Sequence, residues 1–222
     1  MTPTDEFGGG RLYRGDASQA LAAMSDESVD LVLTDPPYPM EFWPAVRAVV
    51  PHMARVLRNG GELVMLTGQH MMPHALDWLR ETGLRYWWTC AMKHHTKARM
   101  LGKYVTICWK PALWFVKGTK RRLDDMPMDM LGGNRPDKKA HEWEQGVEWF
   151  RHWCDRGCNS GETVLDPFMG SGTTGVGCLL TGRKFIGCEL DPTHYATALK
   201  RLRHADGAGS LFDPKQLTLT DG

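Results

Sequence analysis

The sequence lacks an apolar run that could cross a membrane, since no stretch of about 18 uncharged apolar residues occurs in it. Its first ten residues, MTPTDEFGGG, have neither the basic start nor the apolar core of a signal peptide. We therefore expect a cytoplasmic protein whose six cysteines stay reduced. A chain of 222 residues can bury a core without disulfides or a structural metal.

Acidic residues are missing between Cys90 and Arg122, where nine lysines and arginines stand. This segment carries a charge of +9 and the rest of the chain −8, although the whole chain carries only +1. A protein with one basic face suits a polyanionic partner such as nucleic acid. A basic run is also typical of an ordinary solvated surface, so the feature alone does not decide between the two.

The histidines and cysteines lack the spacing of a metal site. The nearest approach is the run from His152 through Cys154 to Cys158, which matches no common zinc pattern and is interrupted by Gly157. We predict that the protein holds no metal.

Strand and helix signals alternate along the chain without a break in composition. The strands at 84–90 and 107–116 are expected to be antiparallel, because no helix-length crossover separates them. The pattern predicts an α/β fold with a doubly wound, mostly parallel sheet and one antiparallel strand. Further strands are expected at 11–13, 29–34, 62–67, 163–165 and 184–188, and helices at 44–57, 74–82, 142–153 and 192–204.

One domain is expected over residues 11–204, with flexible ends at 1–10 and 205–222. Residues 117–139 contain no periodic segment and are predicted to form a long irregular loop. Pro51 should kink or split the helix at 44–57.

The segment from Gly170 to Gly175, GSGTTG, is a glycine turn between a predicted strand and a predicted helix. Glycines let the backbone approach a ligand closely, and Glu189 at the end of the next strand can accept from both hydroxyls of a ribose. A nicotinamide-dependent oxidoreductase would show the same turn, and so would a turn built only for packing. Only about 30 residues of structured chain follow the turn, so most of the sheet must come from upstream sequence.

The segment Asp35-Pro-Pro-Tyr38 ends the strand predicted at 29–34. An exocyclic amino group of a nucleobase is a poor nucleophile, because its lone pair is delocalised into the ring. Acceptors held beside its two hydrogens favour the tetrahedral nitrogen of the transition state. Asp35 and the carbonyl of Pro36 offer two such acceptors, and Tyr38 offers a face on which an extruded base can stack. A simple strand-ending turn would look the same.

The two motifs together, TDPPY at 34–38 and DPFMGSGTT at 166–174, closely resemble the amino-group DNA methyltransferases that use S-adenosylmethionine. Their order resembles the circularly permuted β class of this Rossmann-like fold, over residues 11–204. The resemblance makes Asp35, Pro36, Pro37 and Tyr38 the catalytic loop. It assigns the cofactor to Asp16, Asp166, Phe168, Met169, Gly170, Ser171, Gly172, Thr173 and Glu189.

Aspartate rather than serine before the two prolines favours N6 of adenine as the target within this family. N4 of cytosine, an amino group in RNA, and an inactive nucleic-acid-binding protein with this fold remain open, the last because residues 141–147 depart from the family's HPTQKP-like segment. Target recognition is expected in the basic segment at about 93–140. The residues expected to contact DNA are Lys93, His94, His95, Lys97, Arg99, Lys120, Arg121 and Arg122.

The recognition segment is short, so we expect a short target site or a homodimer that shares recognition. The resemblance implies duplex DNA with a flipped base as the partner. It also implies a nucleoid-associated enzyme, encoded by a host or a phage, that acts in restriction-modification or in a related role.

Overall fold

A computed structural model describes residues 3–100, 103–123, 125–132 and 144–209. Within these ranges the side chains of 94–100, 132, 144–146 and 208–209 fall outside the description. Among the described residues, no helix combines the length and the apolar character needed to cross a bilayer.

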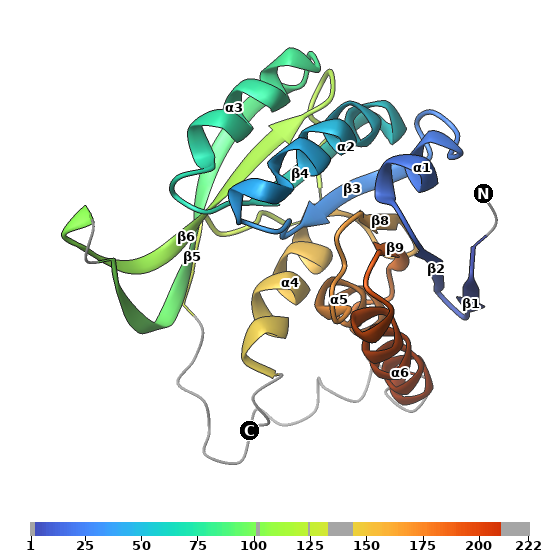
Figure 1. Ribbon diagram of the computed structural model, residues 1–222. Helices are drawn as coiled ribbons and strands as arrows, with labels where there is room; N and C mark the ends of the chain where they lie inside the picture. Colours follow the sequence, from blue (N-terminus) through green and yellow to red (C-terminus); the bar gives the residue numbers. More distant parts are fainter. Residues whose placement is uncertain (1–2, 101–102, 124, 133–143, 210–222) are drawn as a thin grey trace, which may run out of the picture.

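The described strands form one nine-stranded sheet in the order β1-β2-β9-β8-β3-β4-β6-β5-β7 (Figure 1). Its central strands β2, β9, β8, β3 and β4 are parallel, and β6 runs antiparallel to both β4 and β5. The predicted class of a mostly parallel α/β sheet is confirmed. The strands are β1 (Asp5–Phe7), β2 (Gly10–Arg14), β3 (Val29–Thr34), β4 (Leu57–Leu66), β5 (Arg85–Met100), β6 (Val105–Val116), β7 (Met130–Gly132), β8 (Thr163–Asp166) and β9 (Lys184–Glu189).

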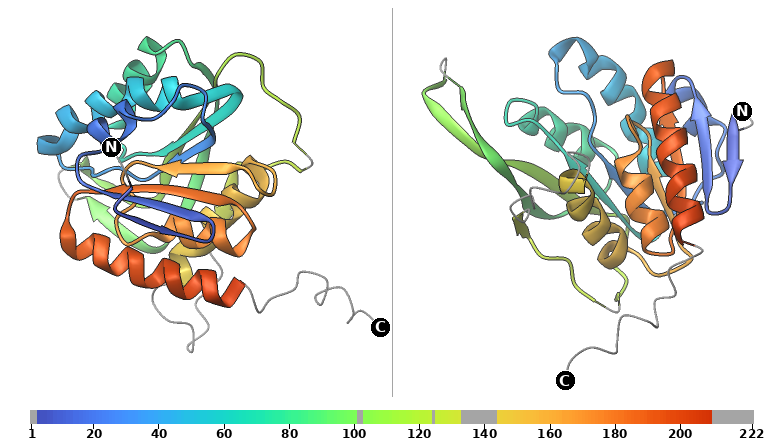
Figure 2. Two further views of the ribbon diagram at one scale, coloured as in Figure 1. Left: turned by 90° about the vertical axis from the view of Figure 1, so that its right-hand side faces the viewer. Right: turned by 90° about the horizontal axis from the view of Figure 1, so that it is seen from below.

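Helices cover both faces of the sheet, as the views in Figures 1 and 2 show. One face packs against α1, α2 and α3, and the other against α4, α5 and α6, so that each face has its own apolar core. All six residues of β3 are buried, which explains its nearly continuous apolar sequence. The helices are α1 (Ala17–Ala22), η1 (Met40–Phe42), α2 (Trp43–Val56), α3 (Met72–Glu81), α4 (Glu144–Gly157), α5 (Thr173–Leu180) and α6 (Pro192–Gly209).

Both ends of the domain are more ordered than the sequence predicted. Residues 5–7, expected to be flexible, form the strand β1 antiparallel to β2. Its Asp5 accepts hydrogen bonds from the Tyr195 hydroxyl at 2.8 Å and from Arg203 at 3.0 Å, both on α6. Helix α6 itself continues to Gly209 rather than ending near 204. A short strand can form here because the carboxylate between two helix side chains holds it on the sheet edge.

Two interior predictions also need correction. Helix α2 runs through Pro51 as one element, so a split at Pro51 is wrong, and the kink stays a prediction. The loop expected at 117–139 contains the short strand β7, which pairs with residues 91–93 of β5. Tertiary pairing supplies hydrogen bonds that a single-sequence pattern does not contain, and this accounts for β7.

Candidate active site

The chain reverses its winding between the neighbouring strands β8 and β3 at the centre of the sheet. Strand β3 leads to α2 on one face and β8 leads to α5 on the other. Open α/β sheets bind ligands in the crevice outside the carboxyl ends of strands at such a point. The sequence places the catalytic-loop motif after β3 and the glycine loop after β8, so both predicted motifs lie at this edge.

The buried carboxylate of Asp166 links the ends of these two strands. It accepts from the Thr34 hydroxyl at 2.7 Å, from the Thr174 hydroxyl at 2.5 Å and from the Phe168 amide at 3.1 Å. Burial raises the pKa of Asp166 to about 6, although the hydrogen bonds from Thr174, Thr34 and Phe168 oppose this shift. The side chain therefore links the two strand ends from inside the fold, and its predicted contact with a cofactor stays a prediction.

The loop after β3 presents Asp35 and Tyr38 at the sheet edge. The Tyr38 hydroxyl donates to Oδ1 of Asp35, and the Nζ of Lys110 lies 3.2 Å from Oδ2. The side chains of Asp35 and Lys110 are 30% and 26% exposed, so both can be reached by a ligand. Pro36 is buried. The prolines fix the backbone, and the side chains stand in one cluster.

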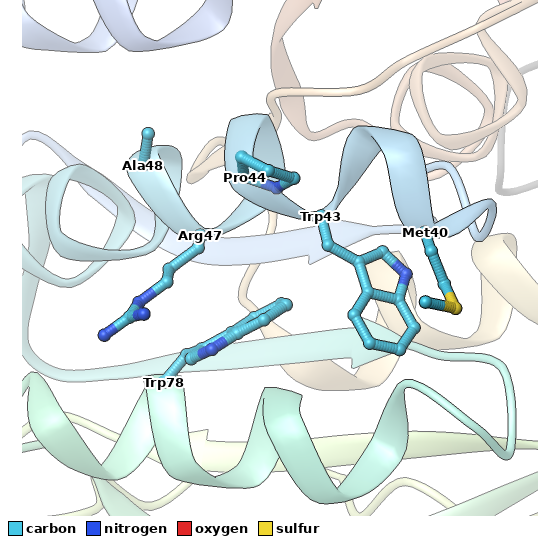
Figure 3. A pocket seen from close by; sticks show the side chains of 6 residues that line it. All are labelled: Met40, Trp43, Pro44, Arg47, Ala48 and Trp78. Carbon is cyan, nitrogen blue, oxygen red and sulfur yellow. The ribbon is translucent and has the colours of Figure 1, made fainter.

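The tryptophan that follows this loop supports it from behind. The Nε1 of Trp43 donates to the main-chain oxygen of Tyr38 at 2.9 Å. On its other side Trp43 lines an open pocket of about 620 Å³ between α2 and α3, together with Met40 and Trp78 (Figure 3). Trp43 was not predictable as a site residue, because nothing in the local sequence shows which carbonyl its side chain reaches.

Gly170 and Gly172, the two glycines at the centre of the glycine loop, have different surroundings. Both have positive φ, +51° at Gly170 and +81° at Gly172. A Cβ at Gly170 would meet no atom within 4 Å, which leaves open space above the turn for a ligand. A Cβ at Gly172 would lie 3.1 Å from the Cβ of Ala198, so this glycine serves the packing of α6. Of these two glycines, Gly170 is the one with open space for a ligand, and the predicted cofactor contact of Gly172 stays a prediction.

Two carboxylates end neighbouring strands next to the glycine loop. Arg14 on β2 pairs with Glu189 on β9, so the strands leading to Asp16 and Glu189 are adjacent. Glu189 accepts from the Gly170 amide at 2.9 Å and from the Asp191 amide at 2.7 Å, and the other lone pairs of its oxygens can accept from a ligand. Asp16 is exposed and caps α1 through Oδ1, which accepts from the Gln19 amide at 3.0 Å.

Four other predicted cofactor residues pack in the core or are held by hydrogen bonds within the protein. Met169 is only 4% exposed and packs in the core against Gly187, and its predicted cofactor contact stays a prediction. Ser171 and Thr173 accept hydrogen bonds from Arg201 at 2.8 and 3.3 Å, which ties this end of the loop to α6. Phe168 is partly buried and packs against the core under α1–α3.

Two of the basic residues assigned to DNA form internal ion pairs instead. Lys120 pairs with the buried Glu62, and the Nη2 of Arg121 donates to Glu162 at 2.8 Å. Glu162 precedes β8, so Arg121 lies at the amino ends of the parallel strands, across the sheet from Asp35. The prediction that Lys120 and Arg121 bind nucleic acid is therefore corrected.

Of the other six residues predicted to contact DNA, two are exposed and four have side chains outside the description. Lys93 is exposed on β5, and Arg122 is exposed beyond the internal ion pairs. His94, His95, Lys97 and Arg99 belong to β5, but their side chains lie outside the described residues. Residues 141–147, which depart from the family's HPTQKP-like segment, also begin outside the described residues.

Comparison with known proteins agrees with this geometry. Residues 29–200 match the family described as DNA methylase, which covers more than half of the chain. The chain belongs to this family. The match includes both loops of the candidate site.

Relatives of this methylase carry related descriptions. It is 25% identical to the DNA adenine methyltransferase YhdJ of Escherichia coli (strain K12), over 86% of this chain and 82% of that protein. It is similar to the solved structure of M1.HpyAVI, with 25% identity, a TM-score of 0.70 and coverage of 87% and 98%. The cytosine-N4-specific PvuII DNA methyltransferase shares the fold, with 16% identity, a TM-score of 0.77 and 94% coverage of each chain.

Removing the hydrogen bond behind the catalytic loop should slow this methylase. Trp43→Phe keeps an aromatic ring but removes the N–H to the Tyr38 carbonyl together with part of the indole, and we expect the lost hydrogen bond to contribute about 1 kcal/mol to the stability loss. The methyl-transfer kcat should fall several-fold, because Tyr38 and Asp35 are held less firmly. Trp78→Phe, in the same pocket, is the matched control. Chemical denaturation and steady-state kinetics test this, and equal effects of the two changes would contradict it.

Proposed function

We propose that this methylase transfers a methyl group from S-adenosylmethionine to the N6 amino group of adenine in DNA. The observation that carries the proposal is the placement of Asp35 and Tyr38 beside the glycine loop and Glu189, at the winding reversal of the sheet. The similarity to a DNA adenine methyltransferase supports adenine as the base.

The residues at the edge fit S-adenosylmethionine. The open space above Gly170 admits a ligand close to the backbone, and Glu189 beside it can accept from ribose hydroxyls. Asp16, at the end of the adjacent strand, leaves Oδ2 to accept from the adenine amino group of the cofactor. M1.HpyAVI, a structural relative of this chain, has been solved as a complex with SAM. When bound, S-adenosylmethionine supplies a methyl group on a positively charged sulfur.

The catalytic loop would then act on the target amino group. Asp35 and the carbonyl of Pro36 accept hydrogen bonds from its two N–H groups, which stabilises the tetrahedral nitrogen of the transition state. When S-adenosylmethionine is bound, its methyl group would pass to this nitrogen, and the electron pair of the broken carbon–sulfur bond would stay on sulfur. The proton would leave the nitrogen as or after the new bond forms and pass to solvent. Tyr38 holds the base by stacking.

DNA would be held by the long ribbon of β5 and β6. Strand β5 runs in the same direction as β4 and continues past residue 90, so the ribbon projects beyond the edge that carries Asp35 (Figure 2). Lys93, Lys103 and Tyr104 are exposed on it, and Tyr104 is 97% exposed. Phosphate contacts from this ribbon should make binding fall steeply with salt. Its size favours a short target site or a homodimer that shares recognition, in an enzyme that works on DNA in the cytoplasm.

The test is methylation of duplex DNA with tritiated S-adenosylmethionine, followed by digestion to nucleosides. Labelled N6-methyladenine is the expected product. Labelled N4-methylcytosine would overturn the assigned base, and label in RNA alone would overturn DNA as the substrate. Cofactor binding without label in any nucleic acid would overturn the enzymatic function.

Changing Glu189 should weaken cofactor binding before anything else. In Glu189→Ala the lost hydrogen bonds to a charged acceptor correspond to about 10- to 100-fold in Kd. Glu189→Gln keeps an oxygen for the Gly170 amide and should show a smaller loss. Glu81→Gln, on the surface of α3, is the control. Calorimetric titration with S-adenosylmethionine checks this, and an unchanged affinity in Glu189→Ala would refute the role.

A further inference from the structure

Lys110 stands in the place where the target base is expected. Its Nζ lies 3.2 Å from Oδ2 of Asp35 and 4.7 Å from the centre of the Tyr38 ring. The acceptor proposed for the amino group and the face proposed for stacking therefore both contact the same ammonium group. A base cannot take this position until the Lys110 side chain moves.

The backbone under Lys110 is fixed, and only its side chain is free to swing. Lys110 pairs with Met92 across β5 and β6, and the oxygen of the next residue, Pro111, accepts from the Thr67 amide at 2.9 Å. The four-carbon stem of lysine allows its charge to move by several ångströms while the strand stays in place. A lysine whose ammonium group can move while its backbone stays fixed can change ion-pair partners.

The charge of Lys110 also conflicts with the reaction if it stays in place. The amino nitrogen becomes positively charged as it takes the methyl group, and a second cation on Asp35 would oppose that charge. An extruded nucleotide brings its own phosphate groups to the mouth of the pocket. These phosphates are the partners that the ammonium group would meet as it leaves.

We infer that Lys110 exchanges Asp35 for a backbone phosphate of the target nucleotide when DNA binds. In the free enzyme Lys110 neutralises Asp35 and covers Tyr38, and in the complex it anchors the extruded nucleotide. Lys110 is thus a positioning residue whose partner depends on DNA. This inference rests on the proposed DNA methyltransferase function.

The exchange is tested by the salt dependence of DNA affinity in Lys110→Met and Lys110→Arg. The slope of log K against log salt should become smaller by about one in Lys110→Met, which loses one phosphate contact. The KM for DNA should rise, while kcat at saturating DNA and the affinity for S-adenosylmethionine change little. Lys110→Arg should keep the wild-type slope. Lys184→Met, an exposed lysine at the start of β9 on the other edge of the sheet, is the control.

A lower kcat with an unchanged salt slope in Lys110→Met would overturn the inference, because it would show that Lys110 only holds Asp35. An unchanged KM and slope would overturn it as well. Failure of the wild-type enzyme to methylate any DNA would instead reject the proposed function. The two failures are therefore distinguished by the wild-type measurement.

Discussion

Asp35→Ala is expected to lower the kcat of methyl transfer by a factor on the order of 10²–10³. The carboxylate is the acceptor proposed for one N–H of the target amino group, and alanine has no acceptor in its place. The glycine loop and Glu189 belong to other strands, so the affinity for S-adenosylmethionine should stay close to that of the wild type. The change thus separates the chemical step from cofactor binding.

The design must allow for the partners that Asp35 has in the free enzyme. Its removal leaves the Tyr38 hydroxyl and the Lys110 ammonium without this acceptor. Asp35→Asn keeps the shape and one oxygen, and we expect its kcat to lie between those of the wild type and Asp35→Ala. Single-turnover methylation measures the chemical step, and calorimetry measures cofactor affinity. Near wild-type turnover in Asp35→Ala would exclude the catalytic role.

The parts of the site that were predictable from sequence are those fixed by a few successive residues. Two prolines after Asp35 allow neither a helix nor an inner strand to continue, so a rigid loop had to follow β3. The positive φ angles at Gly170 and Gly172 follow from the same local logic. Alternation of strands and helices then brought both loops to one edge of the sheet.

The parts that were not predictable depend on partners far away in the chain. Lys120 and Arg121 look like nucleic-acid ligands in sequence, because their carboxylate partners Glu62 and Glu162 lie 58 and 41 residues away. Lys110 was counted within the basic segment, but only the pairing of β6 with its neighbours brings it to Asp35, 75 residues away. The core position of Met169 depends on the turn of its loop and on the close backbone at Gly187.

The second large expected effect concerns Asp166, whose ionisation should lower the free energy of unfolding as pH rises. Its pKa is raised to about 6 by burial, so the folded protein holds this proton more tightly than the unfolded chain, whose carboxyl titrates near 3.8. The contribution of the group is therefore fully present below about pH 4 and is lost as pH rises through about 6. Two pKa units correspond to about 3 kcal/mol of unfolding free energy across this window.

Asp166→Asn should remove this pH dependence while it keeps one oxygen for the hydroxyls of Thr34 and Thr174. Asp77→Asn, an exposed carboxylate on α3, should leave the wild-type profile unchanged. Urea unfolding between pH 4 and 7 measures the effect, and parallel profiles for wild type and Asp166→Asn would contradict it. Because Thr34 directly precedes Asp35, we also expect a lower kcat in Asp166→Asn. The same buried carboxylate then sets both the stability of the strand junction and the position of the catalytic loop.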